Sequence, residues 1–470
     1  MKVLLIYPPQ FHAITPRFKT CLQEGLGFLP PYGLLSIAAQ IKAETASEVQ
    51  ICDCLAERLD YSGLEARIRG FGPDIAGISA LTHTLPDALQ TAGLVKKLDP
   101  AIKVVLGGPH TQIFPRESAA YPNLDYLILG EGEIPFTALI ENLSRGEKPE
   151  GIPGVIDLEH RDPDDDYQPF CTPDLNRLTP PDRSLLPPER YFTVVSTHPP
   201  TTVAISSRGC PHSCIFCHTA GGKSWRGVEP EYLLREIKAA RQLGIKEFFF
   251  FDENFLHSRT RAIKIAELLI KEKLDIYFDF RTRADTVDLE LLQLMKKAGA
   301  QRVQFGLESG SPAILKSLHK GFTIEQAAQA ALWARKAGLI TYASFMLGLP
   351  GEKAEQIRET IAFALSLPLD LADCSIAMPL PETKMYQMAR DKGLIPGDPW
   401  REFALNPKPD FVIPYWEENF SRAELETWLG KFFRHFYLRP AYLLKSLRNL
   451  TGFGELKRKL QAAIKVLGRI

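Results

Sequence analysis

Short apolar runs alternate with helical segments along most of this chain, and no other feature limits its fold as strongly. Residues 3–7 form a fully apolar run, of the kind that is buried on both faces of a parallel sheet. Further strands are expected at 48–53, 74–80, 103–107 and 124–129, and helices at 31–42, 61–69, 86–98 and 134–144. This alternation predicts a doubly wound, Rossmann-like α/β domain over residues 1–145, which binds ligands at the carboxyl ends of its strands.

A second series of strands and helices begins near residue 201. Strands are expected at 203–206, 246–251, 275–280, 301–307, 340–347 and 371–377, and helices at 230–243, 259–273, 287–298, 312–318, 323–337 and 352–366. Six repeats predict a barrel-like sheet, complete or partial, over residues 201–390, with its chemistry at the strand ends. The stretch 146–200 is rich in Pro and Asp and is predicted to be a linker, and residues 391–470 are expected to form a mainly helical C-terminal segment.

The formal charges cancel over the whole chain but not along it. Lys and Arg number 56, as do Asp and Glu, which argues against a nucleic-acid partner, yet residues 421–470 hold 11 Lys and Arg against 3 Asp and Glu. Apolar residues in this tail recur at helical spacing, at Leu456, Leu460, Ala463, Ile464 and Leu467. They predict an amphipathic helix that either lies on an anionic membrane surface or docks on the protein. No signal peptide or membrane span is expected, so the chain is predicted to be cytoplasmic.

Three of the eight cysteines lie in one short loop after the first predicted barrel strand. Cys210, Cys214 and Cys217 have the spacing Cys-x3-Cys-x2-Cys. Three thiolates can bind three irons of a cubane cluster and leave the fourth iron open to a substrate or cofactor. Zinc is an alternative, because His212 and His218 lie in the same loop and could complete a Cys3His site. Thiols that only pack against their neighbours are the third interpretation.

This loop, with Phe216 at its aromatic position, resembles the cluster loop of the radical S-adenosylmethionine (SAM) enzymes. Segments at later strand ends are also similar to that family, among them Gly306-Leu-Glu-Ser-Gly310. The resemblance covers about residues 1–390 and implies a (β/α)6 partial barrel with a 4Fe-4S cluster on the three cysteines. It further implies contacts to SAM at Phe216, Asp252, Arg283, Glu308 and Gly348.

The N-terminal half resembles the subgroup that carries a cobalamin-binding domain. The resemblance implies cobalamin contacts at Tyr32, Gly33, Ser79, Thr82, His83, Thr84, Gly107, Gly108, Pro109, His110, Gly130, Glu131 and Gly132. Many cobalamin proteins bind cobalt through the histidine of an Asp-x-His-x-x-Gly motif, and none of the ten histidines here has Asp two residues before it. Cobalamin is therefore expected with its own base displaced and without a histidine ligand from the protein. His83 and His110 are expected to shape the loops.

The resemblance also implies what the protein does. We expect an enzyme that generates a 5′-deoxyadenosyl radical to functionalise an unactivated carbon, with methyl transfer from methylcobalamin as the first interpretation. Oxidative cyclisation or rearrangement, as in the anaerobic cyclase of (bacterio)chlorophyll synthesis, is the alternative reaction. A cobalamin- or redox-sensing binding protein is the alternative without catalysis. The expected partners are a small-molecule or lipid-like substrate and an electron donor such as flavodoxin or ferredoxin.

Overall fold

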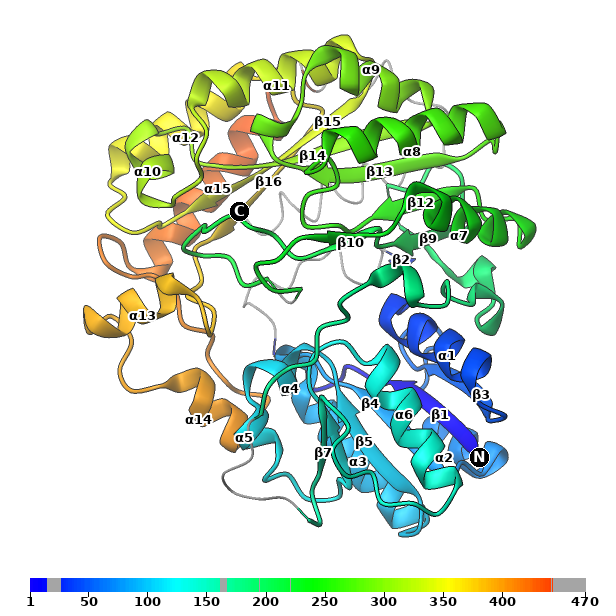
Figure 1. Cartoon of the computed structure of the whole chain (residues 1–470). Helices are drawn as coiled ribbons and strands as arrows, with labels where there is room; N and C mark the ends of the chain where they lie inside the picture. The colour runs from blue at the N-terminus through cyan, green and yellow to red at the C-terminus, as the bar shows by residue number, and fades with distance from the viewer. Residues whose placement is uncertain (15–26, 161–166, 194, 220, 441, 443–470) are drawn as a thin grey trace.

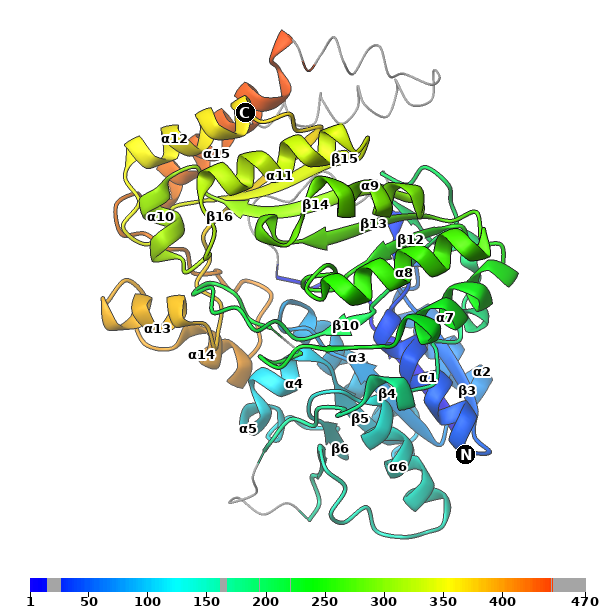
Figure 2. The same ribbon diagram turned by 45° about the horizontal axis from the view of Figure 1, so that its top comes forward.

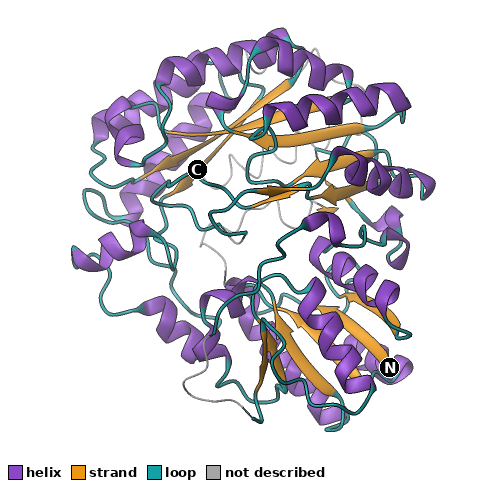
Figure 3. Ribbon diagram, in the orientation of Figure 1, coloured by secondary structure: helices purple, strands orange, loops and turns teal. Residues whose placement is uncertain are grey.

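The computed structural model describes residues 1–14, 27–160, 167–193, 195–219, 221–440 and 442. Two α/β units make up most of it. The first lies at the bottom of Figure 1, in blue and cyan, and the second lies above it, in green and yellow. Figure 3 shows that each unit has strands lined by helices. The predicted mixed α/β fold class is confirmed.

The N-terminal sheet has six strands in the order β3-β1-β4-β5-β6-β7. Its strands are β1 (Lys2–Tyr7), β3 (Glu48–Asp53), β4 (Ile75–Ser79), β5 (Lys103–Gly107), β6 (Tyr126–Ile128) and β7 (Val155–Asp157). The first five are parallel, whereas β7, from the predicted linker stretch, pairs antiparallel with β6. This order reverses direction between β1 and β4, which is the switch point where doubly wound sheets bind ligands.

Helices cover both faces of this sheet because successive strand residues point in opposite directions. Val3 and Leu5 belong to the apolar core formed with α1 (Tyr32–Glu44) and α6 (Glu133–Ser144). Leu4 and Ile6 belong to the core on the other face. That second core contains residues of α2 (Tyr61–Phe71) and α3 (Leu85–Leu98). The continuous apolar pattern of the strands follows from this double burial.

Six parallel strands form the second sheet in strict chain order. They are β9 (Thr201–Ala204), β12 (Glu247–Phe250), β13 (Tyr277–Thr282), β14 (Ala300–Glu308), β15 (Ile340–Leu347) and β16 (Leu371–Ile376). The sheet ends at β9 and β16 instead of closing, so it is a partial barrel. The helices between the strands are α7 (Pro230–Gln242), α8 (Arg259–Glu272), α9 (Leu289–Lys297), α10 (Pro312–Ser317), α11 (Ile324–Lys336) and α12 (Ala354–Ser366).

The C-terminal segment contacts both units. It contains α13 (Lys384–Asp391), α14 (Pro399–Leu405) and α15 (Arg422–Tyr437). Helix α14 packs on α5 (Pro115–Ser118) of the N-terminal unit, and α15 packs on β16 and α12. Figure 2 shows α13 and α14 beside the lower part of the barrel and α15 alongside α12. The predicted amphipathic helix at 456–467 lies outside the described residues.

Short elements complete the described chain. They are the antiparallel pairs β2 (Gly27–Phe28) with β8 (Phe192–Thr193) and β10 (Ser207–Arg208) with β11 (Arg226–Gly227), helix α4 (Pro109–Ile113), and the 3-10 turns η2 (Thr82–Thr84), η3 (Leu175–Arg177), η4 (Arg183–Leu185), η5 (Pro188–Arg190) and η6 (Ala284–Thr286). Across these described stretches, no helix has both the length and the apolar character needed to cross a membrane.

Candidate functional site

The cysteine loop leaves the β10–β11 pair at the carboxyl end of β9. Gly209 begins it at φ +86, and a Cβ at this position would lie 2.2 Å from the carbonyl oxygen of Ser224. The amide of Cys210 donates to the carbonyl of Gly222, at 3.0 Å. Buried Ile215 donates its amide to the carbonyl of Leu318 and fixes the middle of the loop against the barrel. The polar loop is therefore held by backbone bonds and one apolar anchor.

The three predicted cluster ligands lie on this loop within reach of solvent. Cys210 and Cys214 are half-buried and Cys217 is exposed at the surface. Desolvation and the neighbouring Cys214 and Cys210 raise the pKa of the Cys217 thiol to about 11. Neighbouring thiolates repel one another, so three of them in one loop need a strongly cationic partner before all three deprotonate, and iron supplies that charge. The donor chemistry of the loop therefore fits an iron–sulfur cluster.

The two histidines of the zinc alternative have other partners. His218 Nε2 lies 3.2 Å from a carboxylate oxygen of Glu382, and the ring of His212 lies 6.2 Å from that of His257. Among the described residues, no group of three or more His, Cys, Asp and Glu side chains could hold a metal ion as it stands. A cubane cluster spaces its thiolates more widely than a single ion does, because each thiolate binds a different iron.

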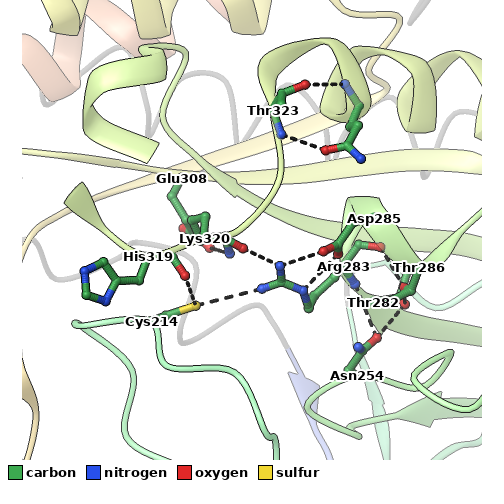
Figure 4. Close-up of polar contacts among 11 residues, drawn as sticks. Cys214, Asn254, Thr282, Arg283, Asp285, Thr286, Glu308, His319, Lys320 and Thr323 are labelled. Carbon is green, nitrogen blue, oxygen red and sulfur yellow. Dashed lines mark hydrogen bonds and ion pairs between the residues drawn. The ribbon is translucent and has the colours of Figure 1, made fainter. Parts of the chain in front are cut away.

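Arg283 connects the end of β13 to the cysteine loop. Its guanidinium donates to both carboxylate oxygens of Asp285, at 2.9 and 2.8 Å, and to the carbonyl of Lys320. Its remaining amino group, Nη1, lies 3.9 Å from the sulfur of Cys214. Figure 4 shows Arg283 between Asp285 and Cys214. This buried cation is thus oriented by a carboxylate toward one of the three thiols.

Glu308 ends β14 in a conformation that few side chains adopt. Its φ is +66, in the left-handed region. Its carboxylate accepts a hydrogen bond from the ammonium group of Lys320, at 3.1 Å, and both side chains are buried. The same ammonium group lies 5.7 Å from the centre of the Phe216 ring. A carboxylate, an ammonium group and an aromatic ring therefore meet beside the cysteine loop. No local sequence pattern pointed to Lys320, because only the turn after α10 brings it to the strand end.

Asp252 lies beneath the cysteine loop. Its side chain is fully buried, and it accepts hydrogen bonds from the hydroxyl of Ser206, at 2.7 Å, and from the hydroxyl of Ser207. Burial raises the pKa of its carboxyl group, and both hydroxyls counteract that effect. We therefore give Asp252 the role of holding the backbone that enters the loop.

Gly348 lies against the C-terminal helix. Its φ is +74, and a Cβ there would lie 2.8 Å from the methyl groups of Leu425 on α15. Its amide donates to a carboxylate oxygen of Glu352, at 2.7 Å. Gly348 thus serves a tight turn that α15 covers.

The predicted cobalamin loops gather at the carboxyl edge of the N-terminal sheet. Position 108 requires glycine for two reasons. Its φ is +109, and a Cβ would lie 2.7 Å from the carbonyl oxygen of Ala80. His110 is fully buried, and its two ring nitrogens lie 3.1 Å from the hydroxyl of Thr82 and 3.0 Å from that of Tyr121. Burial lowers the pKa of His110 to about 3. A neutral imidazole with both nitrogens occupied shapes these loops.

The other predicted cobalamin residues lie on the same edge. Ser79 ends β4 and Thr84 is buried in η2. His83 is exposed, and its backbone carbonyl accepts a hydrogen bond from the amide of Ile14. Tyr32 and exposed Gly33 begin α1, and the hydroxyl of Tyr32 reaches the carbonyl of Ile205, at 3.3 Å. The remaining members of this set are Gly107 at the end of β5, Pro109 at the start of α4, and Gly130 and Gly132 after β6.

An ion-pair cluster joins this edge to the cysteine loop. Arg208, two residues before Cys210, lies 2.5 Å from Glu133 and 3.1 Å from Glu131. Arg226 lies 2.7 Å from the other oxygen of Glu131. Both oxygens of Glu131 are therefore bound to arginines. Sequence reasoning missed this connection, because the partners are about 75 to 95 residues apart.

Comparison with known proteins places the two units. The family model described as the B12 binding domain matches residues 20–140, and the Radical SAM superfamily model matches residues 204–364. An uncharacterised methyltransferase from Pyrococcus horikoshii is 33% identical over 471 residues, which cover 99% of this chain and 98% of that protein. The chain belongs to the radical SAM superfamily. The predicted resemblance is confirmed.

Other proteins are similar to this radical SAM protein along most of its length. The anaerobic magnesium-protoporphyrin IX monomethyl ester cyclase of Rubrivivax gelatinosus is 28% identical and covers 94% of this chain and 78% of its own length. The fold is similar to that of OxsB, a cobalamin-dependent S-adenosylmethionine radical enzyme, with a TM-score of 0.76, 18% identity and coverage of 99% of this chain and 72% of OxsB. The cofactors of this radical SAM protein are a 4Fe-4S cluster, SAM and cobalamin.

Proposed function

We propose that this protein is a cobalamin-dependent radical SAM methyltransferase that transfers a methyl group from methylcobalamin to an unactivated carbon of a small molecule. The observation that carries the proposal is the direct contact between the two sites. Arg208 precedes the cluster cysteines and binds Glu131 and Glu133 of the predicted cobalamin loop. Two cofactor sites on facing edges can hold a substrate between them. The methyltransferase relative, similar along its whole length, supports this reaction.

Three side chains at the strand ends match the groups of SAM. When bound, the cluster supplies the electron that cleaves SAM and cobalamin supplies the methyl group. We assign Lys320 to the SAM carboxylate, Glu308 to its amino group or ribose hydroxyls, and Phe216 to the face of its adenine. In this assignment Arg283 keeps the Cys214 thiol in position. Asp252 and Gly348 support the loops behind these contacts.

The cobalamin loops provide backbone and hydroxyl groups rather than a metal ligand. We propose that Ser79, Thr82 and His83 contact the cofactor from the switch point of the sheet. Because His110 is neutral and has both ring nitrogens engaged, it is not available to bind cobalt. We therefore propose that cobalamin binds with its own base displaced and with no protein histidine on cobalt.

The cyclase relative favours a second candidate reaction, an oxidative cyclisation or rearrangement of the substrate. The mass of the product separates the two reactions. One added methyl group supports methyl transfer, whereas a loss of hydrogens or a gain of oxygen supports the second candidate. Both reactions require a one-electron reductant, and we propose a flavodoxin or ferredoxin for that role.

Replacement of the loop cysteines tests the assignment. Cys210→Ala, Cys214→Ala and Cys217→Ala should each remove the broad brown absorption of the reconstituted protein and lower 5′-deoxyadenosine formation at least about 100-fold, since a cluster that lacks one thiolate is not held. Cys171→Ala is the matched control, because Cys171 is an exposed thiol outside the loop. Full SAM cleavage in any one of the three loop variants would refute the cluster assignment.

A further inference from the structure

The inner face of the barrel carries polar side chains that neither cofactor assignment uses. Parallel sheets are usually covered on both faces. In β16, however, Ala372 and Cys374 are buried on the helix side while Asp373 and Ser375 are exposed on the other. Arg281, on central strand β13, is exposed in the same way between buried Phe280 and Thr282. The accessible face is thus the inside of the barrel, and it is polar.

Arg281 differs from the other cations of this region. Arg302 lies 3.2 Å from Asp279, and Lys320 lies 3.1 Å from Glu308. Arg283 is likewise bound to Asp285. Within the part of the chain that the structure describes, no carboxylate lies within ion-pair distance of Arg281, and its terminal amino groups have no hydrogen-bond partner. Desolvation inside the barrel lowers the pKa of this guanidinium, and the negative charge of Asp373 counteracts that effect only from beyond ion-pair distance.

The position of the Arg281 side chain is fixed. Its guanidinium carbon lies 4.4 Å from the centre of the Phe251 ring, and its Nε donates to the side-chain oxygen of Gln304, at 3.1 Å. Gln304 in turn donates to the hydroxyl of Ser344, at 3.0 Å. A ring and an amide thus hold the inner edge of the guanidinium and leave its two outer amino groups, the fork that binds carboxylates and phosphates, unused.

An acceptor lies farther across the same face. Strand pairing places Gln304 opposite both Arg281 and Tyr342, and Ser344 opposite Asp373. Desolvation inside the barrel raises the pKa of the Asp373 carboxyl group, and hydrogen bonds from Ser344 and Tyr342 and the positive charge of Arg281 counteract that effect. Ionised Asp373 can accept a hydrogen bond from a hydroxyl or amino group.

We propose that the substrate is an acid whose carboxylate or phosphate binds the outer amino groups of Arg281, while a neighbouring hydroxyl or amino group donates to Asp373. This inference rests on the proposed function and names its substrate class. Arg281 precedes Arg283 by two residues, so their Cα atoms lie about 7 Å apart along the chain and the proposed anion site belongs to the same strand end as the residue that contacts Cys214. The Phe251 ring gives the same chamber an apolar wall.

Arginine-selective modification tests the anion site without knowledge of the substrate. The protein, reconstituted with iron, sulfide and hydroxocobalamin, is treated with phenylglyoxal in the presence of inorganic phosphate, acetate or neutral acetamide, and the modified peptides are measured by mass spectrometry. We expect phosphate or acetate to slow modification of Arg281 at least about threefold and acetamide to leave it unchanged. Arg69, a surface residue paired with Glu65, is the internal control for general salt effects. Equal protection of Arg281 and Arg69 would overturn the proposal. The more protective anion identifies the headgroup.

A labelling experiment separates this inference from the proposed function. The reconstituted enzyme receives SAM with a deuterated methyl group and cell-derived small molecules, divided by anion exchange into an anionic and a non-anionic fraction. Label should enter a product from the anionic fraction, and Arg281→Met should lower that incorporation about 100-fold, while Arg145→Met, a surface change, retains it. Label only in the non-anionic fraction overturns the substrate class and keeps methyl transfer. If label enters neither fraction while anions still protect Arg281, the result counts against methyl transfer and leaves the anion site at Arg281 standing.

Discussion

At the scale of single residues, burial sets the protonation state on which the cobalamin edge depends. His110 is fully buried between the hydroxyls of Thr82 and Tyr121 and has a pKa of about 3. Tyr121 also donates to the carbonyl of Ala404, so the imidazole links the β5 loop to the C-terminal segment. Protonation would place an unpaired charge inside this contact.

A pH dependence of stability follows from His110. The folded state holds the neutral form of His110. Its contribution to the free energy of unfolding is therefore complete above the unfolded pKa of 6.5 and is lost as the pH falls from 6.5 toward the folded pKa of about 3. Between pH 7.5 and 5.5 the loss should be about 1 kcal/mol. His110→Gln keeps a donor and an acceptor but does not titrate. The loss of stability between the two pH values should therefore be about 1 kcal/mol smaller in this variant. Urea unfolding of both proteins at the two pH values measures it, and equal losses in both would assign the effect to other groups.

At the scale of the elements, the β10–β11 hairpin decides where the predicted cluster thiols lie. Gly209 and Gly222 both have positive φ, at +86 and +77. A side chain at Gly209 would meet the backbone of Ser224 at 2.2 Å, whereas nothing lies within 4 Å of a Cβ at Gly222. The two positions therefore share one backbone penalty and differ in available space.

This pair provides a matched test of the hairpin. Each change to Ala costs about 1 kcal/mol through its positive φ. Gly209→Ala must in addition displace the hairpin that carries Cys210, so its iron content after reconstitution should fall to less than about half, while Gly222→Ala retains most of its iron. Iron and sulfide analysis after reconstitution measures both. Equal iron content in the two variants would show that the contact at Ser224 does not position the thiols.

At the scale of the whole molecule, buried ion pairs fix how the two units face each other. The side chains of Arg226 and Glu131 are 14% and 9% exposed, whereas those of the surface pair Arg259 and Asp288 are 48% and 40% exposed. A second contact lies at α14, where Arg401 binds Glu117 at 2.7 Å. The distance between the predicted cofactor sites thus depends on a few charges remote in the sequence.

Removal of one member of the buried cluster should weaken the whole assembly. Arg226→Met leaves a carboxylate oxygen of Glu131 without its cation and should lower the free energy of unfolding by about 3 kcal/mol. Arg259→Met, the surface control, should cost about 0.5 kcal/mol. Urea unfolding measures both, and the cobalamin retained after gel filtration reports on the interface itself. Similar values for the two variants would show that the cluster does not hold the units together.

Local sequence patterns determined a large part of this protein. The apolar run at residues 3–7 and the later alternation predicted the strands of both sheets within a few residues, except for β7 in the predicted linker, because hydrophobic periodicity directly reports which faces are buried. The cysteine spacing determined the cluster loop, since all three thiols lie within eight residues. These features depend only on residues that are neighbours along the chain, so the sequence predicts them without knowledge of the tertiary structure.

Only the tertiary structure decided which distant groups meet. It brought Glu308 into an ion pair with Lys320 and Glu131 into one with Arg226. It also placed Asp252 beneath the cysteine loop and packed Leu425 over Gly348. Among the described residues it also left Arg281 without an ion-pair partner, whereas Arg283, Arg302 and Lys320 are paired. Hydrogen bonds and ion pairs form within a few ångströms regardless of chain separation, and sequence periodicity carries no information about that distance. The sequence therefore determined the cofactors, and the packing of the two units decided which side chains lie beside the predicted cofactor loops.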